Sequence, residues 1–96
     1  MIRDLIDAIN SRKEIEFTYS GYVRKAKPVA VGVSRKDNVV LRCYQTEGMH
    51  VTPGHEWDLC LVDDISNLVV TNNVFHVDPP GYKKGDKHMK DIYAEL

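Results

Sequence analysis

The sequence predicts a small, mainly antiparallel β domain: a β-barrel of about five strands with a flanking helix at each end. Three observations predict it. The chain has 96 residues, which suits one core and a single domain over residues 1–96. Its central part alternates apolar and polar residues with the period of a half-buried strand. Turn-forming residues separate these short segments, whereas both ends of the chain space their apolar residues as helices do.

An amphipathic helix is predicted over roughly residues 2–12. Ile2, Leu5, Ile6 and Ile9 follow the i, i+3, i+4, i+7 spacing that makes one apolar stripe. Acidic residues near the start and basic residues at the end suit the helix dipole. Because so short a helix is marginal alone, the stripe is expected to pack on the strands.

The first two strands are predicted as a hairpin. Residues 14–19 alternate, and three of their side chains share one face: Ile15, Phe17 and Tyr19. Ser20-Gly21 suits a tight turn into a second strand over residues 22–33. Pro28 has no N–H to donate to a ladder, so it marks an edge, a bulge or a sharp bend within this strand.

Three more strands complete the predicted barrel, over residues 39–45, 57–61 and 68–71. Alternation along the strands predicts a core made by Ile15, Phe17, Leu41, Cys43, Leu59, Leu61 and Ile65. Cys43 and Cys60 stand in strand-like segments outside any CxxC pattern, so buried reduced thiols are expected rather than a disulfide.

The end of the chain is predicted to be a short helix that begins at Asp86, an N-cap residue. One side of that helix is apolar and carries Met89, Ile92, Tyr93 and Leu96. This stripe either contacts a second copy of the chain or packs on its own barrel. A homo-oligomer is expected, because small barrels expose strand edges and the core of a short chain is limited.

Composition limits the function. The chain has 13 Lys and Arg against 14 Asp and Glu, whereas proteins that coat duplex DNA need a basic excess. Basic residues concentrate between positions 24 and 42, and acidic ones between 56 and 64. These are either two solvated faces or a basic patch for a phosphate-bearing ligand beside an acidic patch. Without a long apolar segment or a signal peptide, no membrane contact and a cytoplasmic location are expected.

No pattern of catalytic residues is present. The sequence has no phosphate-binding glycine loop, nucleophile elbow or HExxH motif, so a non-enzymatic protein is predicted. His50 and His55 lie near Glu56 and Asp58, but this spacing matches no metal template. Neither a metal nor a cofactor is therefore expected.

Roughly residues 2–75 resemble the WYL domain. The similar segments are the helix before a strand with Phe17 and Tyr19, then Arg24 and Pro28, then Val39-Val40-Leu41-Arg42-Cys43-Tyr44, then Asp63-Asp64-Ile65-Ser66-Asn67-Leu68. The resemblance implies a small Sm-like barrel, found mostly as the sensor half of bacterial transcription regulators and in defence-associated proteins. It also implies binding of nucleic acid or nucleotide-type ligands through basic and aromatic residues.

The C-terminal extension, residues 76–96, is similar to short stand-alone relatives in phage and bacterial genomes. Two departures from the family pattern stand out. Val39-Val40-Leu41 replaces the Trp-Tyr-Leu signature, and Asp64 stands where the family usually has an Arg. Asp64 removes a basic contact from the ligand surface that the resemblance implies.

The candidate ligand site combines cations with aromatic rings. Strand alternation places Arg42 and Tyr44 on one face, beside a predicted neighbouring Arg24. Guanidinium groups clamp phosphates, and aromatic rings stack on bases. The candidate residues are Arg24, Arg42, Tyr44, Tyr19, Gln45 and Trp57.

The sequence thus predicts a ligand-binding module for a nucleotide or a short single-stranded nucleic acid. The alternative is a protein-interaction factor that binds a host or phage regulator through the acidic patch and Trp57.

Overall fold

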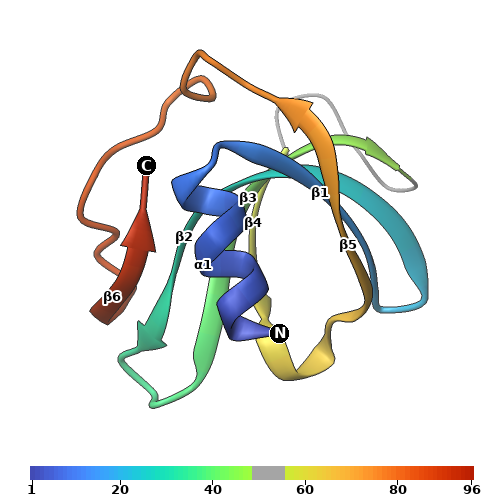
Figure 1. The fold of residues 1–96 in the computed structure, drawn as a ribbon. Coiled ribbons are helices and arrows are strands. Elements are labelled where there is room, and N and C mark those ends of the chain that lie inside the picture. Colours follow the sequence, from blue (N-terminus) through green and yellow to red (C-terminus); the bar gives the residue numbers. More distant parts are fainter. Residues whose placement is uncertain (49–55) are drawn as a thin grey trace.

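The computed structural model describes residues 1–48 and 56–96 (Figure 1). These residues form one α-helix, one short 3-10 helix and six strands: α1 Ile2–Asn10, β1 Lys13–Tyr19, β2 Tyr22–Ser34, β3 Val39–Gly48, β4 Trp57–Leu61, η1 Val62–Asp64, β5 Ser66–Val74 and β6 Met89–Glu95. Every strand pair is antiparallel. The predicted class, mainly antiparallel β with an N-terminal helix, is therefore confirmed. Within the described residues, no helix has the length and apolar character needed to cross a membrane.

The sheet is open. Its strands follow the order β4-β3-β2-β1-β5, with β6 paired to β2 off this path. In the described part of the chain, β4 and β5 end the path at opposite edges and do not pair with each other. The closed barrel that the sequence predicts is therefore not observed, although the strands curve around α1 (Figure 1).

Strand β2 organises the sheet because it serves three neighbours. Along one side it pairs with β3, and on the other side its first part pairs with β1 and its last part with β6. Pro28 lies between these two parts, and the β2–β3 register shifts between Pro28 and Ala30. The residue without an N–H thus stands where the ladder is interrupted, as predicted.

The predicted C-terminal helix is wrong, because residues 89–95 form strand β6. The edge of β2 offers unpaired backbone groups, and pairing with them outweighs the weak helical preference of a short segment. Gly32 permits this approach, since a Cβ atom there would lie 2.1 Å from the Asp91 carbonyl oxygen. Asp86 does not cap a helix, and its carboxylate accepts hydrogen bonds from Arg42 and from the His88 N–H.

The two faces of the sheet carry separate apolar clusters. The inner face packs on α1 through Leu5, Ala8 and Ile9 of the helix. The predicted N-terminal stripe is therefore confirmed for Leu5, Ile6 and Ile9, whereas Ile2 is exposed. The outer face carries a smaller cluster of Val29, Ala30, Val40 and Met89. Ile92 and Leu96 pack against that cluster, whereas Tyr93 is 48% exposed. Most of the C-terminal apolar stripe thus packs on its own chain.

The predicted core is correct in β1 and β3 and wrong in β4. Five of its members are buried: Ile15, Phe17, Leu41, Cys43 and Ile65. In β4, however, Cys60 pairs with Leu41 and is buried, whereas Leu61 is 39% exposed and Leu59 packs on the outer cluster. A shift of one residue exchanges the faces of a strand, which explains the error. Cys43 and Cys60 are free and buried, as predicted.

Candidate ligand-binding site

The six residues predicted from the sequence divide between the two faces of the sheet. In β3, Cys43 and Gln45 are buried on the inner face. Because successive side chains of a strand point to opposite faces, Arg42 and Tyr44 lie on the outer face. Trp57 pairs with Tyr44 in the register and joins the outer group. Arg24 and Tyr19 belong to the inner group. The expected pair on the outer face, Arg42 and Tyr44, is present, but Arg24 and Arg42 do not converge on one phosphate.

On the inner face, Arg24 already has partners. Its Nη1 donates to Asp58 Oδ2 at 2.8 Å, and its guanidinium lies 5.2 Å from the centre of the Tyr19 ring. The Tyr19 hydroxyl oxygen accepts a hydrogen bond from the Leu61 N–H at 3.1 Å. Gln45 is buried, and its N–H donates to the Glu56 carbonyl. These contacts connect β1, β2 and β4, so this group stabilises the sheet.

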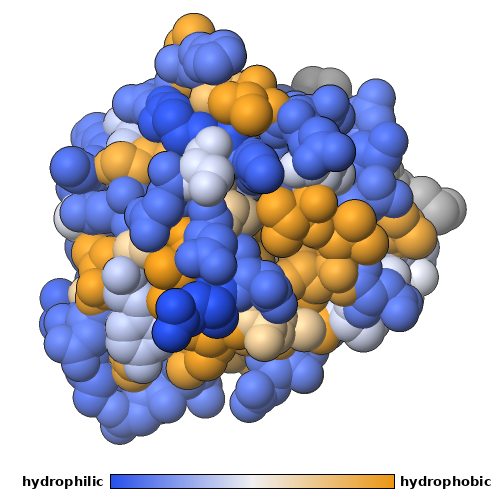
Figure 2. All heavy atoms as spheres, viewed as in Figure 1, coloured by the Kyte–Doolittle hydropathy of each residue, from blue (hydrophilic) through white to orange (hydrophobic). Residues whose placement is uncertain are grey.

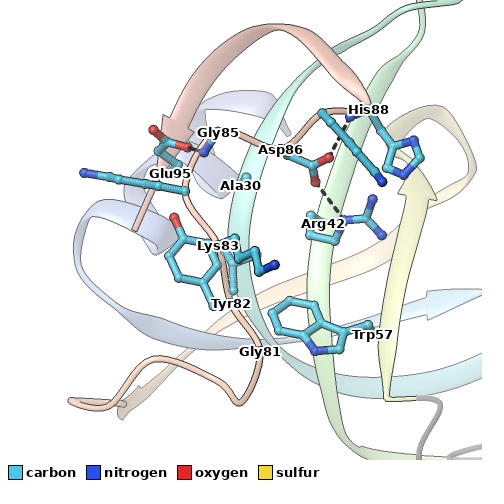
Figure 3. Close-up of a pocket in the computed structure, with 13 residues that line it drawn as sticks. Ala30, Arg42, Trp57, Gly81, Tyr82, Lys83, Gly85, Asp86, His88 and Glu95 are labelled. Atoms are coloured by element: carbon cyan, nitrogen blue, oxygen red, sulfur yellow. Dashed lines mark hydrogen bonds and ion pairs between the residues drawn. The ribbon is translucent and has the colours of Figure 1, made fainter.

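The outer face holds a pocket of about 420 Å³ between the sheet and the segment 81–88 (Figure 3). Val29 and Ala30 form its apolar floor, and Trp57 and Tyr82 supply aromatic rings. Four cationic side chains line the pocket: Arg42, Lys83, Lys84 and Lys87. The carboxylates in its wall are Asp86 and Glu95. The pocket thus combines a flat apolar surface with an excess of positive charge.

Contacts on several sides fix the Trp57 indole. Its Nε1–H donates to the Pro80 carbonyl oxygen at 2.9 Å. The Tyr44 ring meets the indole edge-on, with 5.2 Å between ring centres and 72° between planes. A side chain at Gly81 would place its Cβ 3.7 Å from the indole nitrogen. Tyr44 therefore supports the indole and does not itself line the pocket.

An ion pair joins β3 to the C-terminal segment. Arg42 Nε donates to Asp86 Oδ2 at 2.8 Å, and the two side chains are only 20% and 11% exposed. Burial on its own raises the pKa of Asp86. The hydrogen bonds from Arg42 and the His88 N–H, with the charge of Arg42, outweigh burial and hold that pKa below its usual range. Asp86 is thus a carboxylate that occupies Arg42.

Two further contacts fix the segment around the pocket. The Tyr82 hydroxyl donates to the Leu96 carbonyl oxygen at 2.9 Å. Burial, reinforced by Glu95 and Asp78, raises the pKa of Tyr82, so this hydroxyl keeps its proton. Glu95 in turn accepts a hydrogen bond from the Gly85 N–H at 3.0 Å. Both carboxylates that line the pocket therefore already have partners within the protein.

Among the cations that line the pocket, the lysines are the ones without a partner in the described residues. The ammonium groups of Lys83, Lys84 and Lys87 form no ion pair or hydrogen bond with any residue in the described ranges. Figure 3 shows Lys83 extending into the space between Tyr82 and Trp57. The sequence analysis missed these residues, because the segment has no periodicity that would place it on the sheet. In the sequence, only the adjacent pair Lys83-Lys84 between Tyr82 and Gly85 indicates a candidate phosphate-binding segment here.

No metal centre is seen in the part of the chain that the structure describes, where no three His, Cys, Asp or Glu side chains gather suitably. His50 and His55, considered above for a metal, lie outside the described residues. Comparison with protein-family models, with curated proteins and with solved structures finds no match to this chain. Its function is therefore argued from the pocket itself.

Proposed function

We propose that this protein is a non-enzymatic binding module whose outer-face pocket holds a nucleotide-type ligand. The observation that carries the proposal is the fixed Trp57 indole in a 420 Å³ pocket whose rim bears lysines without partners. An indole offers a stacking surface for a base, and ammonium groups attract phosphate. The apolar floor of Val29 and Ala30 suits the remaining face of a base or ribose.

The size of the pocket and the charge of the chain favour a small ligand. About 420 Å³ lies within the usual range of small-molecule pockets. The chain as a whole has a net charge of −1, whereas long nucleic acids reward many dispersed cations. A mononucleotide, or the end of a short single strand, therefore suits the pocket better than a duplex.

The proposal includes the finer fold assignment, an Sm-like barrel of the WYL type that acts as a ligand sensor in a regulatory, phage or defence context in the cytoplasm. The curvature of the strands around α1 supports this assignment (Figure 1). The register shift of β2 between Pro28 and Ala30 supports it too, because irregularities of this kind bend a strand and let a short sheet curl. Arg42, part of the resemblance, lines the pocket.

Calorimetric titration tests the proposal with AMP, ADP, cyclic AMP and a trinucleotide. Wild-type protein should bind at least one of them with micromolar affinity. Trp57→Ala should weaken binding by roughly 5- to 150-fold, because stacking contributes about 1–3 kcal/mol per base. Tyr93→Ala is the matched control, since Tyr93 is an exposed aromatic residue that does not line the pocket. If no ligand binds below the millimolar range, the proposal is wrong.

Exposed apolar residues favour one alternative, a protein-interaction factor. Val69 and Val74 of the edge strand β5 are 55% and 46% exposed, and Val70 beside them is 36% exposed. Figure 2 shows an apolar patch where β5 runs in the same view. Exposed apolar edges mark contacts with other chains. Retention of one defined host or phage regulator by the wild type, lost in Val69→Lys, would favour this function over ligand binding.

A further inference from the structure

One cation of the pocket, Arg42, is already neutralised by a carboxylate. Arg42 is paired with Asp86, whose carboxylate is 11% exposed and also accepts the His88 N–H. A phosphate that displaced Asp86 would leave this carboxylate largely buried without its guanidinium partner, which is unfavourable. Asp86 engages Nε of Arg42 and leaves its Nη groups as donors, but the pair as a whole carries no net charge. The net positive charge that attracts a ligand phosphate therefore comes mainly from the lysines.

The remaining cations are close together in the sequence. Lys83, Lys84 and Lys87 all line the pocket, and none is paired with a described residue. Of the two carboxylates in the pocket, Asp86 is paired with Arg42, whereas Glu95 accepts a neutral N–H from Gly85 and keeps its negative charge. The segment 83–87 thus supplies three of the four cationic side chains in a lining that holds two carboxylates, which leaves a net excess of positive charge.

The number of these lysines indicates how much negative charge the bound phosphate group carries. A phosphate monoester carries about 1.5 to 2 negative charges near pH 7, whereas an internal phosphodiester carries about one. A group of three ammonium ions gains more from the monoester, and a diphosphate adds further charge. Ammonium groups bind phosphate as point charges, so they require no particular ester geometry.

We propose that the pocket recognises a terminal phosphate, with Lys83, Lys84 and Lys87 as the phosphate subsite and Trp57 as the base subsite. This inference rests on the proposed function and specifies its ligand: a nucleotide with a phosphate monoester or a diphosphate, and not an internal phosphodiester. Two sources supply this group, a free nucleotide or the phosphorylated end of a nucleic acid.

Calorimetric titration of the full chain separates the ligands. AMP should bind at least tenfold more tightly than adenosine or cyclic AMP, and ADP at least as tightly as AMP. A trinucleotide with a 5′-phosphate should bind at least tenfold more tightly than its 5′-hydroxyl form if nucleic acid ends are a source. If the 5′-phosphate form does not bind but AMP does, the free nucleotide is the source.

Two triple variants provide the matched comparison. Lys83→Ala, Lys84→Ala and Lys87→Ala together should abolish the preference for AMP over adenosine. Lys13→Ala, Lys25→Ala and Lys36→Ala together remove the same charge from residues outside the pocket and should retain it. If both triple variants lose the preference equally, the effect is one of net charge and the subsite is refuted.

The outcomes distinguish this inference from the proposed function. Equal affinity for AMP, adenosine and cyclic AMP, with all three weakened by Trp57→Ala, would overturn the phosphate subsite and leave the base subsite intact. Failure of every ligand to bind would overturn both.

Discussion

Arg42 on β3 and Asp86 in the C-terminal segment form an ion pair with 2.8 Å between Nε and Oδ2, across 44 positions of sequence. The pair connects the outer face of the sheet to the segment that closes the pocket. Arg42, which the sequence indicated as a phosphate-binding residue, is thus bound to a carboxylate of the same chain. The stability of the pocket wall should therefore depend on this pair.

Asp86→Ala should lower the free energy of unfolding by about 1.5–3 kcal/mol, because it leaves a partly buried guanidinium without its charged acceptor. Lys90→Ala is the control, since it breaks the exposed Asp37–Lys90 pair, and such pairs contribute about 0–1 kcal/mol. Urea denaturation measures both. Equal losses in the two variants would show that the Arg42–Asp86 contact adds nothing specific.

The same pair predicts a pH dependence. The folded-state pKa of Asp86 is lowered, so the unfolded chain binds the proton more readily than the folded protein does. The stabilisation from Asp86 is then fully present above the unfolded pKa of about 4 and is lost as the pH falls through the folded pKa. The stability difference between wild type and Asp86→Asn should be constant from pH 5 to 8 and shrink below pH 4. A difference that grew with acidification would contradict the assignment.

Leu41 and Leu61 test the assignment of the sheet faces. Leu41→Ala should cost about 2–5 kcal/mol, because the side chain is fully buried. Leu61→Ala should cost less than about 1 kcal/mol, since Leu61 is 39% exposed. Chemical denaturation of both variants provides the comparison. A loss below about 0.5 kcal/mol for Leu41→Ala would mean that β3 faces the other way.

Gly32→Ala should separate β6 from β2. The added Cβ would meet the Asp91 carbonyl oxygen at 2.1 Å, and overpacking of this kind costs typically 1–3 kcal/mol or more. Hydrogen exchange should become faster for the amides of residues 89–95 than for those of β1. Val23→Ala is the control, because Val23 also lies in β2 but its side chain is 55% exposed. Unchanged protection of β6 would argue against the close approach of these strands.

The assembly state is still a prediction. The edge strand β5 exposes Val69 and Val74, so we expect a homodimer or larger assembly at high micromolar concentration. Light scattering should then give at least twice the chain mass of 11.0 kDa, and Val69→Lys should lower it. A wild-type mass near that of one chain would refute the assembly.

Local patterns predicted the elements whose partners are near in sequence. The stripe of α1 and the alternation of β1 and β3 follow from side-chain period alone, and Pro28 marked the interruption of β2 through its missing N–H. Long-range pairing decided the rest. Residues 89–95 form a strand because β2 offers an edge, and the alternation of β4 gave no sign that Cys60 rather than Leu59 faces the core.

The candidate site was predicted only in part for the same reason. Arg42 and Trp57 were identified from residue type and alternation, and both line the pocket. Arg24 was grouped with them, although its strand position directs it to the opposite face. Lys83 and its neighbours reach the pocket only through the path of segment 81–88. That path depends on contacts between residues far apart in sequence, such as the Tyr82 hydroxyl with Leu96 and Arg42 with Asp86.

The most direct test of the outer-face pocket is a nuclear magnetic resonance titration with AMP. Trp57 is the one tryptophan of the chain, so its indole N–H gives a single, assignable signal. We expect saturable shifts of that signal and of the Gly81 and Gly85 amides, while the signals of the Arg24 and Tyr19 amides on the inner face stay in place. An unchanged indole signal at millimolar AMP, or the largest shifts at Arg24 and Tyr19, would contradict this expectation.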